Sequence, residues 1–138
     1  MRAPSVSELV DDPVVVEALE KAWNESLPGD SARRHEEGGW IYMDITSGRI
    51  EVRSAAAGTQ ATLDLSAPHE IPSAVVVATF HTHPNPSAEG WETGPSAADV
   101  QSAWFFGVPC IIRADDGIHT TGPDSRRGGL AGGPGYPA

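Results

Sequence analysis

Cysteine is almost absent from this sequence. The 138 residues include one cysteine, so no disulfide can form within the chain and the composition does not indicate an oxidising compartment. Basic residues are also scarce, with nine lysines and arginines against nineteen acidic residues and a formal net charge of −10. This balance argues against nucleic acid and anionic membranes as partners, because basic side chains make those contacts.

Long apolar runs are lacking as well. No stretch approaches membrane-spanning length, and the opening MRAPSVSELVDDP carries acidic residues where a signal peptide needs an apolar run. We therefore expect a cytoplasmic protein. The length fits a single domain, which we expect over residues 1–122. A Gly/Pro-rich flexible tail is expected over residues 123–138 and contains Arg126-Arg127-Gly128-Gly129.

Local patterns predict a mixture of helices and strands. Apolar residues at helical spacing predict helices over residues 14–27 and 96–106. Alternating or β-branched runs predict strands over residues 39–46, 49–54, 61–65, 75–80, 108–113 and 118–121. Asp11 or Asp12 can cap the first helix, and Trp104 and Phe105 on the second are expected in the core. The order indicates an α/β (α+β) fold, with one mixed β-sheet sandwiched by helices.

Two short motifs carry the chemistry. His81-Thr82-His83-Pro84 follows the buried run VVVATF, and Ser96-Ala97-Ala98-Asp99 opens the second helix. Residues two apart on a strand point to the same side, so the two imidazoles face one point. A carboxylate from the helix would complete a three-ligand metal site with a fourth position for water, which is typical of catalytic zinc.

Each motif also has an ordinary explanation. An H-x-H pair is common, and Ser96 followed by Asp99 is the start of a capped helix. Taken alone, capping is the better explanation of Ser96. The two motifs together are much rarer than either one, and the combination favours a metal site held by His81, His83 and Asp99.

The combined pattern resembles the JAMM (MPN-plus) zinc metalloprotease family, specifically its small bacterial members. The family pattern is an upstream glutamate, then H-[ST]-H-P, then S-x-x-D. The run Glu36-Glu37-Gly38-Gly39 matches the upstream part, with Glu36 as the matching glutamate and Glu37 as the alternative. Two features depart from the pattern: twelve residues, 84–95, separate His83 from Ser96, and WIYMDITSG replaces a glycine-patterned strand.

The resemblance implies an MPN-like fold and a peptidase or isopeptidase with one Zn²⁺ per chain. It implies that Glu36 is the general base, that Ser96 stabilises the oxyanion, and that His81, His83 and Asp99 bind the zinc. The implied substrate is a protein or peptide, with the Gly-Gly C-terminus of a ubiquitin-like or sulfur-carrier protein as one class. Trp91, in the loop between the ligands, is a weaker candidate for substrate binding.

Competing interpretations stay open at this point. The chain can be a catalytically silent MPN-like interaction module, or an effector or immunity protein of a bacterial toxin system. The oligomeric state is not indicated by any pattern. Among the remaining candidates, His35, His69 and His119 are expected at the surface, and Cys110 is interpreted as a buried apolar residue.

Overall fold

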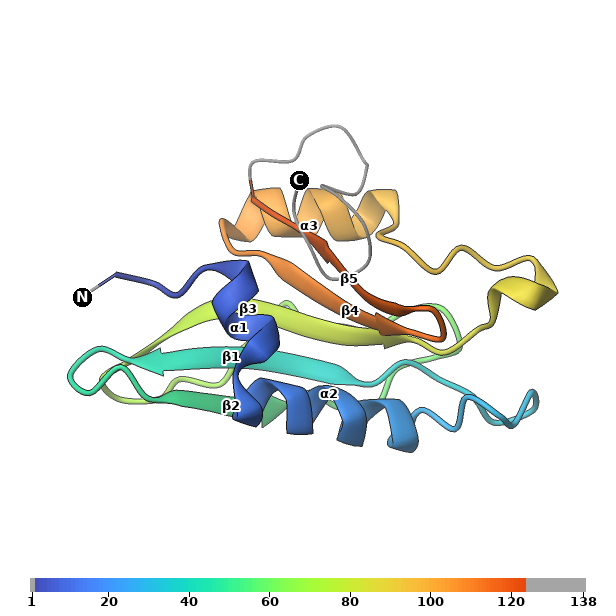
Figure 1. Cartoon of the computed structure of the whole chain (residues 1–138), viewed down its shortest axis with the longest axis horizontal. Coiled ribbons are helices and arrows are strands. Elements are labelled where there is room, and N and C mark those ends of the chain that lie inside the picture. Colours follow the sequence, from blue (N-terminus) through green and yellow to red (C-terminus); the bar gives the residue numbers. More distant parts are fainter. Residues whose placement is uncertain (1, 124–138) are drawn as a thin grey trace.

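The computed structural model describes residues 2–123 and contains three α-helices and a five-stranded sheet (Figure 1). The helices are α1 (Val6–Asp11), α2 (Pro13–Glu25) and α3 (Ala97–Phe106), and a 3₁₀ turn, η1, covers Ser87–Glu89. The strands are β1 (Gly38–Asp44), β2 (Ile50–Ser54), β3 (Ala74–His83), β4 (Cys110–Ala114) and β5 (Gly117–Thr121). The predicted α+β class, with one mixed sheet in one small domain, is confirmed. The expected tail lies almost entirely outside the described residues.

The sheet has the strand order β2-β1-β3-β4-β5, so β3 lies at its centre, as the apolar run predicts. The β3–β4 pair is parallel and the other pairs are antiparallel. Because a parallel pair needs a crossover, the chain leaves β3 after His83, forms α3 and returns to β4. This crossover places the start of α3 near the end of β3.

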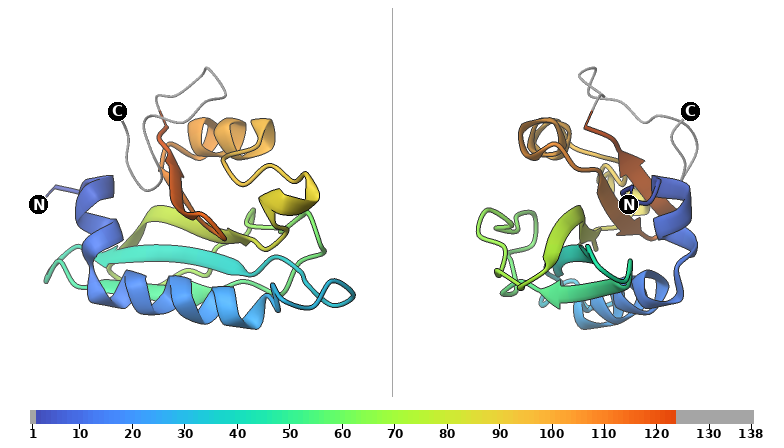
Figure 2. Two further views of the ribbon diagram at one scale, coloured as in Figure 1. Left: turned by 45° about the vertical axis from the view of Figure 1, so that its right-hand side comes forward. Right: turned by 90° about the vertical axis from the view of Figure 1, so that its left-hand side faces the viewer.

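The helices cover opposite faces of the sheet (Figure 2). Helices α1 and α2 pack on one face, where their apolar side chains and those of β1, β3 and β4 form the larger core. Helix α3 lies on the other face, where Ala103 packs with Cys110 and Ile112 of β4 in a smaller apolar cluster. The connection between β2 and β3 also covers this second face, next to α3.

The segment 61–65 is not a strand, so this prediction was wrong. Both edges of β1 are already paired, with β2 and with β3. The segment lies over the face of β1 instead, where the Trp40 indole N–H donates to the Leu65 carbonyl at 3.0 Å. The Tyr42 hydroxyl likewise donates to the His69 carbonyl at 2.7 Å. Side chains of β1 therefore fix this connection without a β-ladder.

Helix α3 also corrects a prediction about the core. Trp104 and Phe105 were expected inside, but they are 48% and 75% exposed. Consecutive helical residues point about 100° apart, so a run of three aromatic residues cannot all face the sheet. The smaller Val100 and Ala103 face it instead.

Two features at the N-terminal end complete the fold. Asp12, one of the two expected caps, accepts a hydrogen bond from the Val14 amide at the start of α2. Helix α1 was not predicted, although Ser5 and Glu8 form a capping box there. None of the helices within residues 2–123 has the length and apolar character needed to cross a membrane.

Candidate metal centre

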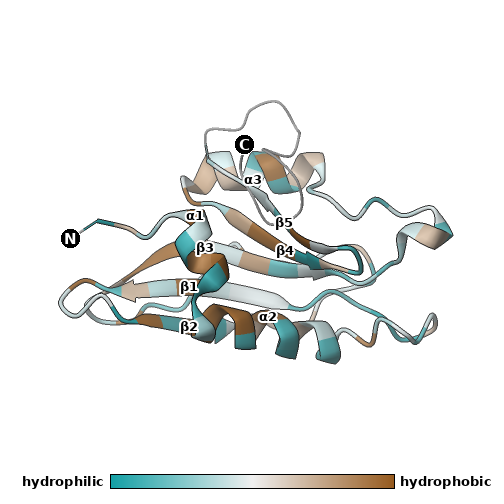
Figure 3. Cartoon of the chain, in the orientation of Figure 1, coloured by the Kyte–Doolittle hydropathy of each residue, from teal (hydrophilic) through white to brown (hydrophobic). Residues whose placement is uncertain are grey.

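Strand β3 changes from apolar to polar along its length, and the candidate site lies at its polar end (Figure 3). Phe80 and Ala78 contribute to the core under α1 and α2. His81 and His83 alternate with them and therefore point to the opposite face, towards α3. Thr82, between the two histidines, is fully buried, and its hydroxyl lies 2.6 Å from that of Ser26.

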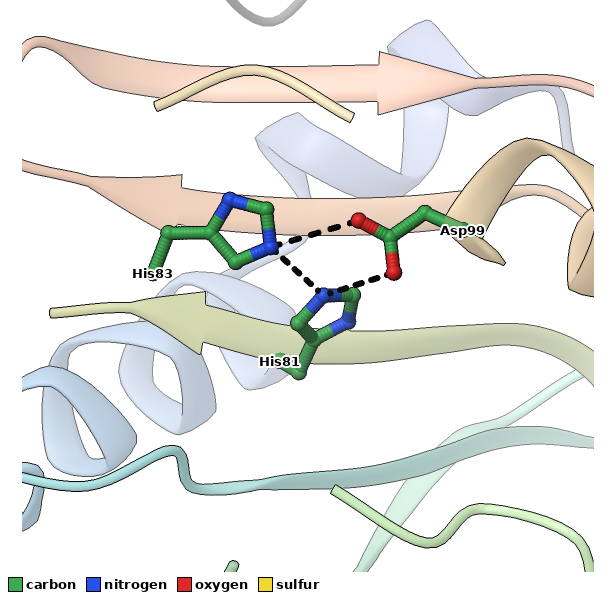
Figure 4. Close-up of side chains that lie close together, drawn as sticks. All are labelled: His81, His83 and Asp99. Carbon is green, nitrogen blue, oxygen red and sulfur yellow. Dashed lines mark hydrogen bonds and ion pairs between the residues drawn. The ribbon is translucent and has the colours of Figure 1, made fainter. Parts of the chain in front are cut away.

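Helix α3 brings Asp99 to the two histidines. Ser96 is the N-cap, and its hydroxyl accepts a hydrogen bond from the Asp99 amide at 3.1 Å. The Asp99 carboxylate in turn accepts one from the Ser96 amide at 2.9 Å. This capping box holds the first turn of α3 at the end of β3, and the carboxylate faces both imidazoles (Figure 4).

His81, His83 and Asp99, which we call the donor triangle, bring two imidazole nitrogens and both oxygens of one carboxylate close together. His81 Nε2 lies 3.1 Å from His83 Nε2 and 3.2 Å from Asp99 Oδ1, and His83 Nε2 lies 3.2 Å from Asp99 Oδ2. Ligands at zinc-bond length from one tetrahedral centre are separated by about 3.4 Å, which is close to the separations of these donor atoms. Calcium and magnesium prefer all-oxygen shells, which two imidazoles do not supply. Among residues 2–123, this is the one group of three His, Cys, Asp or Glu found to be suitable for a metal ion.

The electrostatics of the group favour a bound positive charge. Burial would raise the pKa of Asp99, but the two imidazoles hold the pKa well below its usual range. Burial would likewise lower the pKa of His81, yet its contacts with Cys110 and Asp99 raise it well above the ordinary value. The carboxylate therefore stays ionised at neutral pH, and the group attracts either a proton or a metal ion.

The outward-facing nitrogens of both histidines also have partners. His81 Nδ1 lies 3.4 Å from Cys110 Sγ, and His83 Nδ1 lies 3.2 Å from the Thr93 carbonyl oxygen. In both rings Nε2 faces the triangle and Nδ1 faces away. Such outer contacts orient ligand imidazoles and select their tautomer.

His119, expected at the surface, is buried at 4% exposure, so this prediction was wrong. Its Nε2 contacts Asp116 Oδ1 at 2.7 Å, and Asp116 Oδ2 accepts a hydrogen bond from the Thr93 hydroxyl at 2.8 Å. His119 is therefore linked, through Asp116 and Thr93, to the carbonyl that contacts His83. The tight spacing Asp116-x-x-His119 around the β4–β5 turn is the sequence signal that could have found this pair.

Glu36 faces the same groove as the triangle, whereas Glu37 does not. Glu36 is 7% exposed, and its burial raises the pKa of its carboxyl above the usual value. Residues 58–59 hold its backbone, since the Glu36 amide donates to the Thr59 carbonyl and the Gly58 amide donates to the Glu36 carbonyl. The Glu37 carboxylate instead contacts His35 Nε2 at 2.5 Å.

Glycine after the two glutamates is required by packing. Gly38 pairs with His81, and a Cβ at Gly38 would lie 2.2 Å from the Phe80 carbonyl oxygen. No side chain fits at that distance, so Gly38 lets β1 approach the end of β3 closely. The glycine of the E-x-G-G motif therefore has a steric role, because the close approach of β1 to β3 brings Glu36 into the same groove as the histidines.

A groove of about 700 Å³ contains the triangle. Glu36, Ser96 and Trp91 line it together with His81, His83 and Asp99, so the structure brings all six predicted site residues to one cavity. Trp91 is 40% exposed at its wall. The rest of the groove wall includes three apolar side chains from the β2–β3 connection and α3, namely Leu63, Leu65 and Phe106. The acidic side chains of Asp64 and Glu92 also line the groove.

No protein-family model, curated protein or solved structure matches this chain. Two imidazole nitrogens and one carboxylate oxygen converge, a buried carboxyl with a raised pKa shares their groove, and a serine hydroxyl lies beside them. Groups of these types occur together in sites of metal-assisted hydrolysis.

Proposed function

We propose that this protein is a zinc-dependent hydrolase of the JAMM type that cleaves a peptide or isopeptide bond. The observation that carries the proposal is the shared groove, where the donor triangle of His81, His83 and Asp99 meets the buried carboxyl of Glu36. A silent metal site has no need of a carboxyl held at a raised pKa beside it. A general base or acid needs such a pKa, because it must exchange a proton near the working pH.

Zinc bound by the three ligands would polarise the scissile carbonyl and lower the pKa of a water molecule. Glu36 would accept the proton of an attacking water molecule and deliver it to the leaving amine. Ser96 has its hydroxyl oxygen engaged by the Asp99 amide, so the hydroxyl proton remains available to donate to the developing oxyanion. Burial around Glu36 and His81 keeps bulk water from screening these charges.

The groove supports an extended, uncharged or cationic segment as substrate. Its wall contains the acidic Asp64 and Glu92 besides Glu36 and Asp99, and no lysine or arginine among residues 2–123 lines it. An anionic substrate would face repulsion from these groups. The first class to test is the Gly-Gly C-terminus of a ubiquitin-like or sulfur-carrier protein, because its small residues can pass close to buried side chains.

The deciding experiment measures zinc content and hydrolysis on the same preparations. We expect about one zinc per chain in the wild type, and loss of zinc in His81→Ala and Asp99→Ala. Glu36→Gln should keep its zinc while the rate on a fluorogenic Gly-Gly substrate falls about 10²- to 10⁴-fold. Glu37→Gln is the matched control, because its carboxylate contacts His35 outside the groove.

The same variants separate hydrolysis from a silent binding role. An interaction module would keep partner binding in Glu36→Gln and would show no hydrolysis in the wild type. Absence of zinc from the wild type after supplementation at neutral pH would contradict the proposed function. Equal rates for wild type and Glu36→Gln would contradict the role given to Glu36.

A further inference from the structure

Cys110, the one cysteine of the chain, lies against the outer side of a proposed metal ligand. It begins β4, where it pairs with Thr79 of the parallel strand β3. Its side chain points to the α3 face, is 3% exposed, and places Sγ 3.4 Å from His81 Nδ1. The sequence alone suggested only a buried apolar residue at this position.

A metal bound at His81 Nε2 would decide which atom donates in this contact. His81 Nε2 faces Asp99 and His83, so it must present a lone pair to bind a metal. A neutral imidazole with a free Nε2 carries its proton on Nδ1. The Nδ1–H would then donate towards Cys110 Sγ, and the 3.4 Å between these atoms is a normal distance for a hydrogen bond to sulfur.

We propose that Cys110 is a positioning residue, which selects the metal-binding tautomer of His81 and fixes the orientation of its ring. This inference rests on the proposed zinc site. The Thr93 carbonyl contacts Nδ1 of His83 in the same way, so each proposed ligand histidine has one acceptor beside its Nδ1. The difference is that the acceptor behind His81 is a side chain, and substitution can therefore remove it.

Two other roles for Cys110 fit the contacts less well. A fourth ligand would need to face the triangle, but Sγ contacts the nitrogen on the far side of the ring. A purely apolar role accounts for the packing of Cys110 with Ala103 and Ile112. It does not account for the approach of sulfur to a ring nitrogen, and it predicts that any loss of packing in this cluster has the same effect.

The test compares Cys110→Ala and Cys110→Ser with Ile112→Val in the full chain. Ile112→Val removes packing from the same cluster but no acceptor. Zinc affinity is measured by competition with a chromophoric chelator, and Co²⁺ absorption spectra report the ligand geometry. We expect Cys110→Ala to weaken zinc binding about 10- to 100-fold, as loss of an outer-shell partner does. Cys110→Ser, which keeps an acceptor, should recover part of that loss, and Ile112→Val should bind zinc like the wild type.

A measurement without any substitution covers the case in which these variants fail to fold. Nitrogen NMR of the zinc-loaded wild type should show His81 protonated at Nδ1. Metal bound through Nδ1 would overturn the proposal, as would wild-type zinc affinity in Cys110→Ala or equal losses in Cys110→Ala and Ile112→Val. In each of those results the wild type still binds zinc, so the proposed function survives. A wild type that binds no zinc overturns both.

Discussion

The described part of the chain, residues 2–123, contains two capping boxes with the same local geometry and different surroundings. At α1, the Glu8 amide donates to the Ser5 hydroxyl and the Glu8 carboxylate accepts from the Ser5 amide, at 3.2 and 2.9 Å. At α3, the Asp99 amide and carboxylate make the same two contacts with Ser96, at 3.1 and 2.9 Å. Both motifs read S-x-x-[DE] in the sequence, and both start a helix.

The two carboxylates differ in what else they contact. The Glu8 side chain is 51% exposed and pairs with Arg2 near the N-terminus. The Asp99 side chain is 16% exposed and meets two histidines from a strand. The capping box alone therefore carries no chemistry. It becomes part of a candidate metal site only where the fold brings the second motif within reach.

Zinc binding should separate the two boxes most strongly. With free zinc about 1,000-fold above its Kd, binding should stabilise the wild type by about 4 kcal/mol. Glu8→Gln should keep this whole increment, because Glu8 is not near the triangle, whereas Asp99→Asn should lose it. Unfolding in denaturant, with zinc and with a chelator, measures both effects. An equal zinc increment in the two variants would place the metal elsewhere in the chain.

The two cap serines give a smaller, matched contrast. Ser5→Ala and Ser96→Ala should each cost about 1 kcal/mol of unfolding free energy, because each removes the acceptor for one helix amide. Only Ser96→Ala should also lower kcat, by about 100-fold, through loss of an oxyanion donor. It should keep its zinc, since Asp99 still accepts from the Ser96 backbone amide. Full activity in Ser96→Ala would leave Ser96 with its capping role alone.

The sequence predicted the local parts of this site, and its central strand, from short-range patterns. Side chains two residues apart on a strand point to the same side, which predicts that His81 and His83 face the same way. A serine followed three residues later by an acidic residue predicts a helix start, as at Ser96 and Asp99. Their meeting depends on the parallel β3–β4 crossover, which no local pattern encodes. The co-occurrence of the two motifs suggested that they meet, and the structure brings the residues together.

The wrong predictions for residues 61–65 and for His119 share a cause, because each depended on contacts between distant segments. Residues 61–65 alternate like a strand, but β1 already has two neighbours, so they pack on its face. His119 is polar and follows a turn, yet β4 and Asp116 enclose it. Cys110 was correctly expected to be buried, but its contact with His81 depends on the register of β4 against β3. Pattern alone does not fix that register.

The smallest expected contrast is in acid titration, and it concerns Glu8 in the capping box of α1. The hydrogen bonds from Arg2 and Ser5 lower the pKa of Glu8 from 4.5 to about 2. A carboxyl with a lowered folded-state pKa stabilises the fold above its unfolded pKa, and this contribution is lost as the pH falls towards 2. Carbon NMR of the Glu8 carboxyl should therefore give a midpoint near 2, with the amides of α1 shifting over the same range.

Arg2→Ala should raise that midpoint towards the ordinary value, because the Arg2 hydrogen bond is the largest cause of the lowered pKa. The variant should leave zinc binding unchanged, since the α1 box is separate from the triangle. A wild-type midpoint near 4.5 would show that Arg2 does not hold Glu8 in solution. Ser5 would then be the only partner that holds the Glu8 carboxylate in the α1 box. The Asp99 carboxylate of the α3 box differs, because the imidazoles of His81 and His83 hold its pKa low.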